Sequence, residues 1–121
     1  MAALSFSVCR EKILSGAKRQ TIRGDRKFPI KKGDKLYLWW KQRISDREKL
    51  GNTTCLRITP ITIERDRSTM PNIVFTDPDL LDGFAIKDGF DNWQQLIEFF
   101  DKSHGLPFTG NLIEWDYPFK S

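Results

Sequence analysis

The chain has 121 residues, enough for one domain, and its mixture of 39% hydrophobic and 30% charged residues builds a core and excludes a disordered tail. No apolar run approaches the ~20 residues that a bilayer span needs, and no signal peptide is recognisable, so we expect no membrane association. Residues 1–49 carry 14 Lys and Arg against 5 Asp and Glu, whereas residues 77–121 carry 3 Lys and Arg against 9 Asp and Glu. The basic first part suggests an anionic partner such as nucleic acid. The alternative is that the basic and acidic parts pair with each other in the folded domain.

The N-terminal half is predicted to be mainly strands. Leu4 to Phe6 alternates as a strand does, and Ser7 is the expected cap of a helix that stops at Gly16. Strands are then predicted for Arg19 to Arg23, for Leu36 to Lys41 and for Thr53 to Glu64, with Ile44 to Asn52 as an exposed loop. Pro60 within the last strand favours an edge position or a bulge.

The C-terminal half changes to helical periodicity. A short strand is predicted for Ile73 to Phe75, followed by helices over Pro78 to Lys87 and Asp91 to Ser103. Asp91 is the expected N-cap of the second helix, Gly105 ends that helix, and Thr109 to Trp115 is the last strand. Five or six short strands with two or three helices, two of them inserted before the final strand, predict an α+β barrel.

Cysteine and histidine are too scarce for several kinds of site. Cys9 and Cys55 cannot form a disulfide framework, and they favour a reduced, cytoplasmic protein. One His and two separated Cys exclude a zinc site of the usual Cys/His kind. We therefore expect no metal and no other cofactor. His104 follows a predicted helix and is interpreted as an end cap rather than a general base.

The most informative segment is Gly16-x-Lys18-x-x-x-x-Arg23, between the first helix and a strand. Three further features accompany it along the chain: the turn Lys32-Gly33-Asp34 before an aromatic strand, Asp88-Gly89-Phe90 before a Trp-bearing helix, and Gly105-Leu106-Pro107 before the last strand. In this combination and order the sequence resembles the ASCH domain of the PUA-like superfamily. The resemblance implies one domain over residues 1–121, a small PUA-like β-barrel with flanking helices, and a role with RNA or nucleosides.

The resemblance also implies roles for particular residues. ASCH-type amidohydrolases remove the acetyl group from N4-acetylcytidine, and similarity to them makes Lys18, Thr21 and an acidic residue the catalytic candidates, with Arg23 in the binding motif. The family acid is a glutamate, and its counterpart here is Asp88, one methylene shorter. Asp82 stands in an identical Asp-Gly-Phe tripeptide and is the alternative acid.

Amide cleavage sets two conditions on these residues. Thr21 is the candidate nucleophile and Lys18 its base, so Lys18 must be neutral, which requires its pKa to fall by about 2–3 units from ~10.4. Side chains alternate along a strand, so Lys18 and Thr21 meet only if Gly16 to Arg19 is a turn and the strand begins near Gln20. Asp88 then handles the leaving group or a water, and Arg23 holds a phosphate or an oxyanion.

Aromatic and cationic residues also cluster around the third predicted strand. Tyr37, Trp39 and Trp40 adjoin Lys41 and Arg43, a pattern typical of platforms on which unpaired bases stack. Consecutive Trp residues face opposite sides of a strand, so we expect one in the core and one near the cleft. Trp93 and Trp115 are predicted core residues.

Two functions of different class follow from these residues. The first is binding of RNA or a modified nucleoside in a cationic cleft that includes Arg19, Arg23, Trp39, Lys41 and Arg43. The alternative is a hydrolase, either an N4-acetylcytidine amidohydrolase or a ribonuclease, that uses Lys18, Thr21 and Asp88. A protein-interaction domain, favoured only by the acidic C-terminal half, is a third class.

Overall fold

The structure is a computed structural model that describes residues 2–41 and 47–119. These residues form an α+β fold of seven strands and three helices. In chain order the elements are β1 (Ala2–Phe6), α1 (Arg10–Ser15), β2 (Gln20–Arg23), β3 (Lys35–Trp40), β4 (Glu48–Glu64), β5 (Arg67–Met70), β6 (Ile73–Phe75), α2 (Pro78–Lys87), α3 (Trp93–Ser103) and β7 (Phe108–Trp115).

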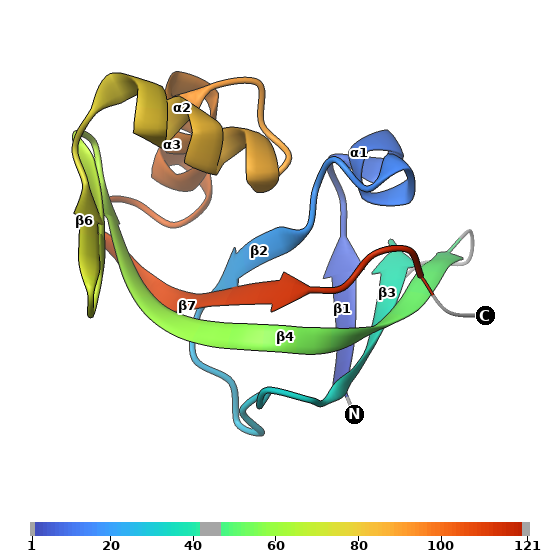
Figure 1. The fold of residues 1–121 in the computed structure, drawn as a ribbon. Coiled ribbons are helices and arrows are strands. Elements are labelled where there is room, and N and C mark those ends of the chain that lie inside the picture. The colour runs from blue at the N-terminus through green and yellow to red at the C-terminus, as the bar shows by residue number, and fades with distance from the viewer. Residues whose placement is uncertain (1, 42–46, 120–121) are drawn as a thin grey trace.

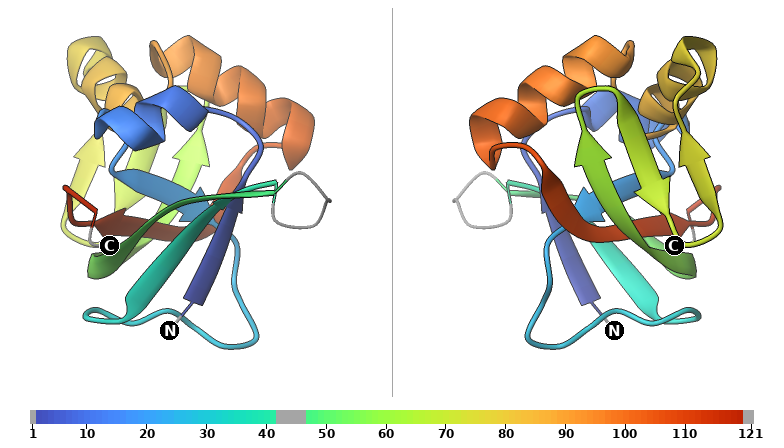
Figure 2. Two further views of the ribbon diagram at one scale, coloured as in Figure 1. Left: turned by 90° about the vertical axis from the view of Figure 1, so that its right-hand side faces the viewer. Right: turned by 90° about the vertical axis from the view of Figure 1, so that its left-hand side faces the viewer.

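The long strand β4 organises the sheet. It pairs with β3 near its start, with β7 along its second half and with β5 at its end, always antiparallel. Beyond these neighbours, β1 pairs with β3 in parallel, β6 extends β5, and β2 extends β7. Figure 1 shows β4 curving beneath the other elements, and Figures 1 and 2 show all three helices on the same side of the curved sheet.

The seven strands form an open sheet and do not close into the barrel that the sequence predicted. Within the described residues, β1 and β2 are the ends of two branches that share no backbone ladder. The four residues of β2 all pair with β7. On its other side β2 is linked to β1 by a side chain, because the Arg23 guanidinium Nη2 donates to the Ser5 carbonyl at 2.7 Å. The sequence therefore predicted the α+β class, whereas the strand number and the closure of the sheet differ from the prediction.

Most predicted elements lie where expected, and β6 and α2 have the predicted bounds. Two predicted caps are wrong. Cys9 rather than Ser7 is the N-cap of α1, and Asn92 rather than Asp91 is the N-cap of α3, where its side chain accepts from the Gln95 amide. Asp91 instead forms an ion pair with Lys12 at 2.6 Å, which holds its side chain on the side of α1.

The predicted loop Ile44 to Asn52 is also wrong in part. Residues 44–46 lie outside the described residues, and Glu48 to Asn52 form the start of β4. Their pairing with β3 overrides their polar character. Among the described residues, Pro60 is paired on one side alone, with Asn111 of β7, so it occupies a local edge of β4, as predicted.

Two hydrophobic cores lie on the two sides of β7, because neighbouring strand residues point to opposite faces. Leu112 joins the core under α2 and α3, which includes Trp93, and Ile113 joins the core between the β1–β3–β4 strands and α1, which includes Trp115. Both tryptophans are buried, as predicted. In the part of the chain that the structure describes, no helix has the length and apolarity to cross a bilayer.

Candidate functional site

The segment from Gly16 to Arg19 is a turn that ends where β2 begins. Gly16 closes α1 with a φ of 84°, and a Cβ at this position would lie 2.6 Å from the Tyr117 ring, so both the backbone and the space require glycine. The Lys18 amide then donates to the Lys12 carbonyl and the Arg19 amide to the Lys87 carbonyl. Strand pairing starts at Gln20, which is the geometry that the amidohydrolase hypothesis requires.

This turn brings Lys18 and Thr21 to one cavity. The cavity has a volume of about 200 Å³ and is lined by both residues together with Arg23 and Asp88. Phe6 from one core and Phe90 and Phe100 from the other complete its apolar wall, so it lies at the junction of the two cores. Lys18 and Thr21 are nevertheless 96% and 94% buried, which limits the cavity to a small group.

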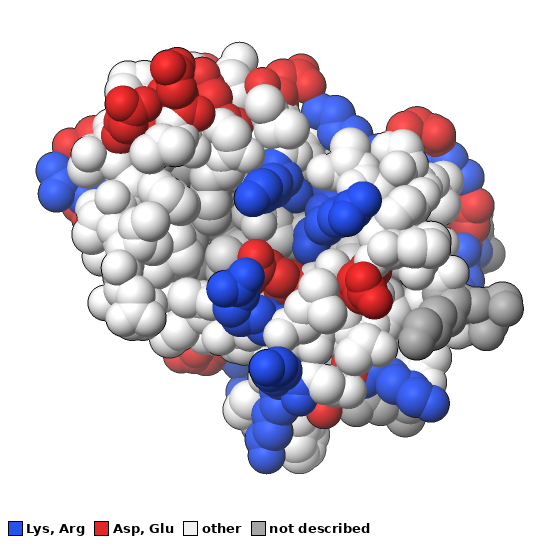
Figure 3. Space-filling view, viewed as in Figure 1, with Lys and Arg blue, Asp and Glu red and all other residues white. Residues whose placement is uncertain are grey.

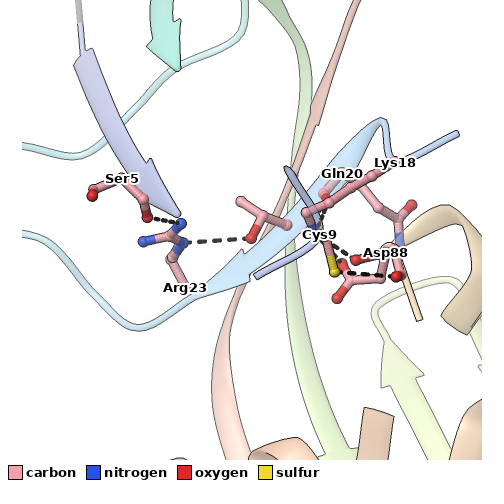
Figure 4. Close-up of polar contacts among 8 residues, drawn as sticks. Ser5, Cys9, Lys18, Gln20, Arg23 and Asp88 are labelled. Atoms are coloured by element: carbon pink, nitrogen blue, oxygen red, sulfur yellow. Dashed lines mark hydrogen bonds and ion pairs between the residues drawn. The ribbon is translucent and has the colours of Figure 1, made fainter. Parts of the chain in front are cut away.

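Lys18 is held by two carbonyl groups. Its Nζ donates to the carbonyls of Gln20 at 2.7 Å and of Asp88 at 2.5 Å, and it lies 3.9 Å from the Asp88 carboxylate Oδ1 (Figure 4). Burial lowers the pKa of the Lys18 ammonium, and the charge of Asp88 opposes this effect. A neutral amine can donate two hydrogen bonds and keeps one lone pair, so the two carbonyl contacts are compatible with a base.

Asp88 follows the last residue of α2 and is 97% buried. Burial raises the pKa of its carboxyl from 3.8 to about 6, while Lys18 acts in the opposite direction. Its Oδ1 and the Nε2 of Gln20 are buried without a hydrogen-bond partner among the described residues. The two side chains point toward each other (Figure 4), and the Gln20 amide acts as a donor that lowers the pKa of the Asp88 carboxyl against the larger effect of burial.

Asp82, the alternative acid, has a different role. Its Oδ1 accepts a hydrogen bond from the Trp93 amide at 2.8 Å, so it supports the N-terminus of α3. Asp82 is not among the residues that line the Lys18 cavity. Of the two Asp-Gly-Phe tripeptides, the second therefore supplies the carboxylate beside Lys18.

Arg23 spans the open seam between β1 and β2. Besides its bond to Ser5, its Nε donates to the Thr21 hydroxyl at 3.4 Å, and its guanidinium lies 4.8 Å from the centre of the Phe6 ring. Thr21 and Arg23 thus share one face of β2, as predicted. Because Arg23 lines the same cavity, its positive charge is available to an anion or an oxyanion near Thr21.

The other predicted nucleic-acid-binding residues lie away from this cavity. Arg19 is exposed, donates to the Gly16 carbonyl at 2.8 Å and rests over the Tyr117 ring. Trp39 and Lys41 do not line the cavity, and Arg43 lies outside the described residues. The predicted single cleft is therefore divided into a buried cavity and an outer surface.

That outer surface is the stacking platform, which we define as Tyr37 and Trp39 of β3 with Arg47 and Lys49. The Lys49 ammonium lies 5.1 Å from the Tyr37 ring and 6.0 Å from the Trp39 ring, and the Arg47 guanidinium lies 5.8 Å from Trp39. Trp40 is half-buried against the second core, and Lys41 lies over its ring. The two consecutive tryptophans thus have different surroundings, and Trp39 belongs to the platform rather than to the cavity.

Two cavity residues were not predicted as site residues. Cys9 has a left-handed backbone, with φ of 66°, and its thiol donates to the Gly89 carbonyl at 3.1 Å. Burial raises the pKa of this thiol. His104 caps α3, as predicted, but its ring also lines the cavity and packs 4.8 Å from Phe108. The sequence signal for this site is the glycine of Asp88-Gly89-Phe90. A Cβ at Gly89 would lie 2.8 Å from Lys18 Cδ and 3.0 Å from the Cys9 thiol, so only glycine leaves room for both side chains.

No protein-family model matches the chain, and neither the curated proteins nor the solved structures include a significant match to it. The functional assignment therefore depends on the chain's own residues and their geometry.

Proposed function

We propose that the chain is an ASCH-type, PUA-like domain whose Lys18 cavity hydrolyses the acyl amide of an N4-acylated cytosine base. The observation that carries this proposal is the convergence of Lys18, Thr21, Arg23 and Asp88 on one cavity of about 200 Å³. Burial lowers the pKa of the Lys18 ammonium and raises that of the Asp88 carboxyl to about 6. An amine and a carboxyl group whose pKa values are moved toward neutral pH are a pair that can exchange protons during a reaction.

The reaction can be written with the residues that line the cavity. The Thr21 hydroxyl attacks the acyl carbon while the Lys18 amine accepts its proton, and Arg23 stabilises the oxyanion. The amide C–N bond then breaks as Lys18 or Asp88 gives a proton to the leaving amino group of cytosine. Water, with its proton accepted by the same groups, releases the acyl group from Thr21 as a carboxylic acid.

The volume of the Lys18 cavity limits the size of the substrate that it can hold. At ~30 Å³ for each water, a volume of about 200 Å³ holds on the order of seven waters, less than the ~300–1,000 Å³ of typical ligand sites. This space suits a single base with its acyl group and not a stack of bases. Release of cytidine from N4-acetylcytidine is therefore the first assay.

Three variants make the assay specific. Thr21→Val keeps the shape of the side chain and removes its hydroxyl, Lys18→Met removes the base, and Asp88→Asn removes the acid. Each is expected to lower turnover by at least about 100-fold, the usual contribution of a nucleophile or a general base. Asp82→Asn is the matched control and retains turnover. Wild-type protein that releases no cytidine, or Thr21→Val protein that stays fully active, would contradict the proposal.

A second candidate function, binding of single-stranded RNA, is favoured by the stacking platform. Tyr37 and Trp39 alternate along β3 with cations 5.1–6.0 Å from their rings, an arrangement that suits stacked bases and adjacent phosphates. Trp39→Ala is expected to weaken binding of a short oligonucleotide by about 1–3 kcal/mol. Affinity should also fall with salt. Binding that ignores both salt and Trp39→Ala would exclude the platform.

A further inference from the structure

A second and larger hollow lies on the other side of β2. It has a volume of about 610 Å³ and lies between α2 and the strands β4 and β7. We call it the α2 groove, and Figure 3 shows it as a depression with cationic side chains beside it. Gln20 lines the α2 groove, whereas its neighbour Thr21 lines the Lys18 cavity. The volume is within the ~300–1,000 Å³ range of small-molecule sites.

The α2 groove has an apolar floor. Phe84 and Leu112 are buried core residues that also line it, and Met70, Phe75 and Pro60 extend this surface. At its rim, Leu80 and Ile73 remain 56% and 47% exposed, although both are large apolar side chains. An apolar floor with exposed apolar edges is a surface that a flat hydrophobic ring would cover.

Gly83 keeps the helical wall of the α2 groove open. It lies inside α2, and a Cβ on it would meet nothing within 4 Å. Glycine inside a helix is less favourable than alanine, and neither the backbone nor the packing of this helix requires it. Its position is explained if a ligand approaches the α2 backbone closely.

The polar groups of the α2 groove are divided between its two ends. Asp79 is in the first turn of α2 and Lys87 is its last residue, about 12 Å away at 1.5 Å per residue. At the Lys87 end, Arg57 is paired with Glu114 at 2.7 Å, whereas Lys87 has no ion pair among the described residues. This end therefore carries one uncompensated positive charge, which suits an anionic group.

We propose that the α2 groove is a second binding site, distinct from the Lys18 cavity, for a small aromatic anion. Its ring lies on Phe84 and Leu112 beside Gly83, and its anionic group lies beside Lys87. This site goes beyond the proposed hydrolase and does not depend on it.

The test uses two fluorescent probes that differ mainly in charge. 1-Anilinonaphthalene-8-sulfonate has a flat apolar body and a sulfonate, and N-phenyl-1-naphthylamine lacks the sulfonate. We expect the sulfonate probe to bind the wild-type protein more tightly by up to about fivefold, because one exposed charge contact is worth up to ~1 kcal/mol. Lys87→Glu is expected to remove this preference, and equal binding of the two probes by the wild type would overturn the anionic part of the proposal.

Two tryptophan variants of α2 locate the site. Gly83→Trp fills the α2 groove and should abolish binding of both probes, whereas Ile86→Trp adds the same side chain to an exposed position that does not line it and should retain binding. Circular dichroism and thermal unfolding establish that each variant is folded, and Gly83→Leu replaces the larger variant if that one is not. Thr21→Val should leave probe binding unchanged even if it abolishes hydrolysis. Binding that survives in folded Gly83→Trp protein, or that is lost equally in Ile86→Trp, overturns the proposal.

Discussion

The charge of Asp88 should make the folded protein less stable as pH rises. Its pKa is raised from 3.8 to about 6 in the folded state, so the folded protein holds this proton more tightly than the unfolded chain does. The contribution to stability is therefore complete below pH 3.8 and is lost as pH rises to about 6. At 1.36 kcal/mol per pH unit, the difference between these two values corresponds to about 3 kcal/mol.

Asp88→Asn removes this titration with little change in shape. We expect urea unfolding curves, followed by tryptophan fluorescence from pH 4 to pH 8, to give the variant a gain relative to the wild type of about 2.5 kcal/mol, because a small part of the contribution is already lost at pH 4. The wild type and the variant share their other carboxylates, so the difference between them isolates Asp88. Carbon-13 NMR of the Asp88 carboxyl gives its pKa directly.

Lys18 supplies the control for this experiment. Its charge lowers the pKa of Asp88, so in a Lys18→Met background the carboxyl should titrate at higher pH and the window should move upward. Wild-type and Asp88→Asn proteins whose stabilities run parallel from pH 4 to pH 8 would refute the argument, because Asp88 would then titrate as it does in the unfolded chain.

Other expected outcomes concern the local structure. Gly16→Ala should destabilise the fold by about 2 kcal/mol, from a left-handed alanine and displacement of the Tyr117 ring, whereas Gly24→Ala, where a Cβ meets nothing within 4 Å, should be nearly neutral in thermal unfolding. Asn92→Ala should cost about 1 kcal/mol through loss of the α3 cap, whereas Asp91→Ala, which removes an exposed ion pair, should cost clearly less; equal costs would contradict the capping assignment.

Local signals in the sequence were sufficient for several elements. Pro78 at the first position of α2, the helical spacing in α3 and the glycine after α1 depend only on neighbouring residues, and these elements were predicted well. The second strand was predicted from Arg19, one residue before β2 begins. The later start at Gln20 is the condition under which Lys18 and Thr21 can meet, and both residues line one cavity.

Features that depend on distant partners were not predicted. The polar segment at the start of β4 becomes a strand because β3 pairs with it, and β5, with the sequence Arg-Ser-Thr-Met, was missed because its strand character comes from pairing with β4 and β6. The roles of Asp82 and Asp88 could not be separated from identical tripeptides. The opening of the sheet depends on which strand β2 pairs with, and local sequence does not specify that choice.

The seam between β1 and β2 has a consequence for how firmly these two strands are held together. In a closed barrel, separating two strands would break several backbone hydrogen bonds at once. Here the bond from Arg23 to the Ser5 carbonyl links the strands, and a single hydrogen bond of a charged group is worth about 1.5–3 kcal/mol. The same guanidinium also lies over the Phe6 ring of β1, so a phosphate or oxyanion that drew Arg23 away would compete with both contacts between the strands.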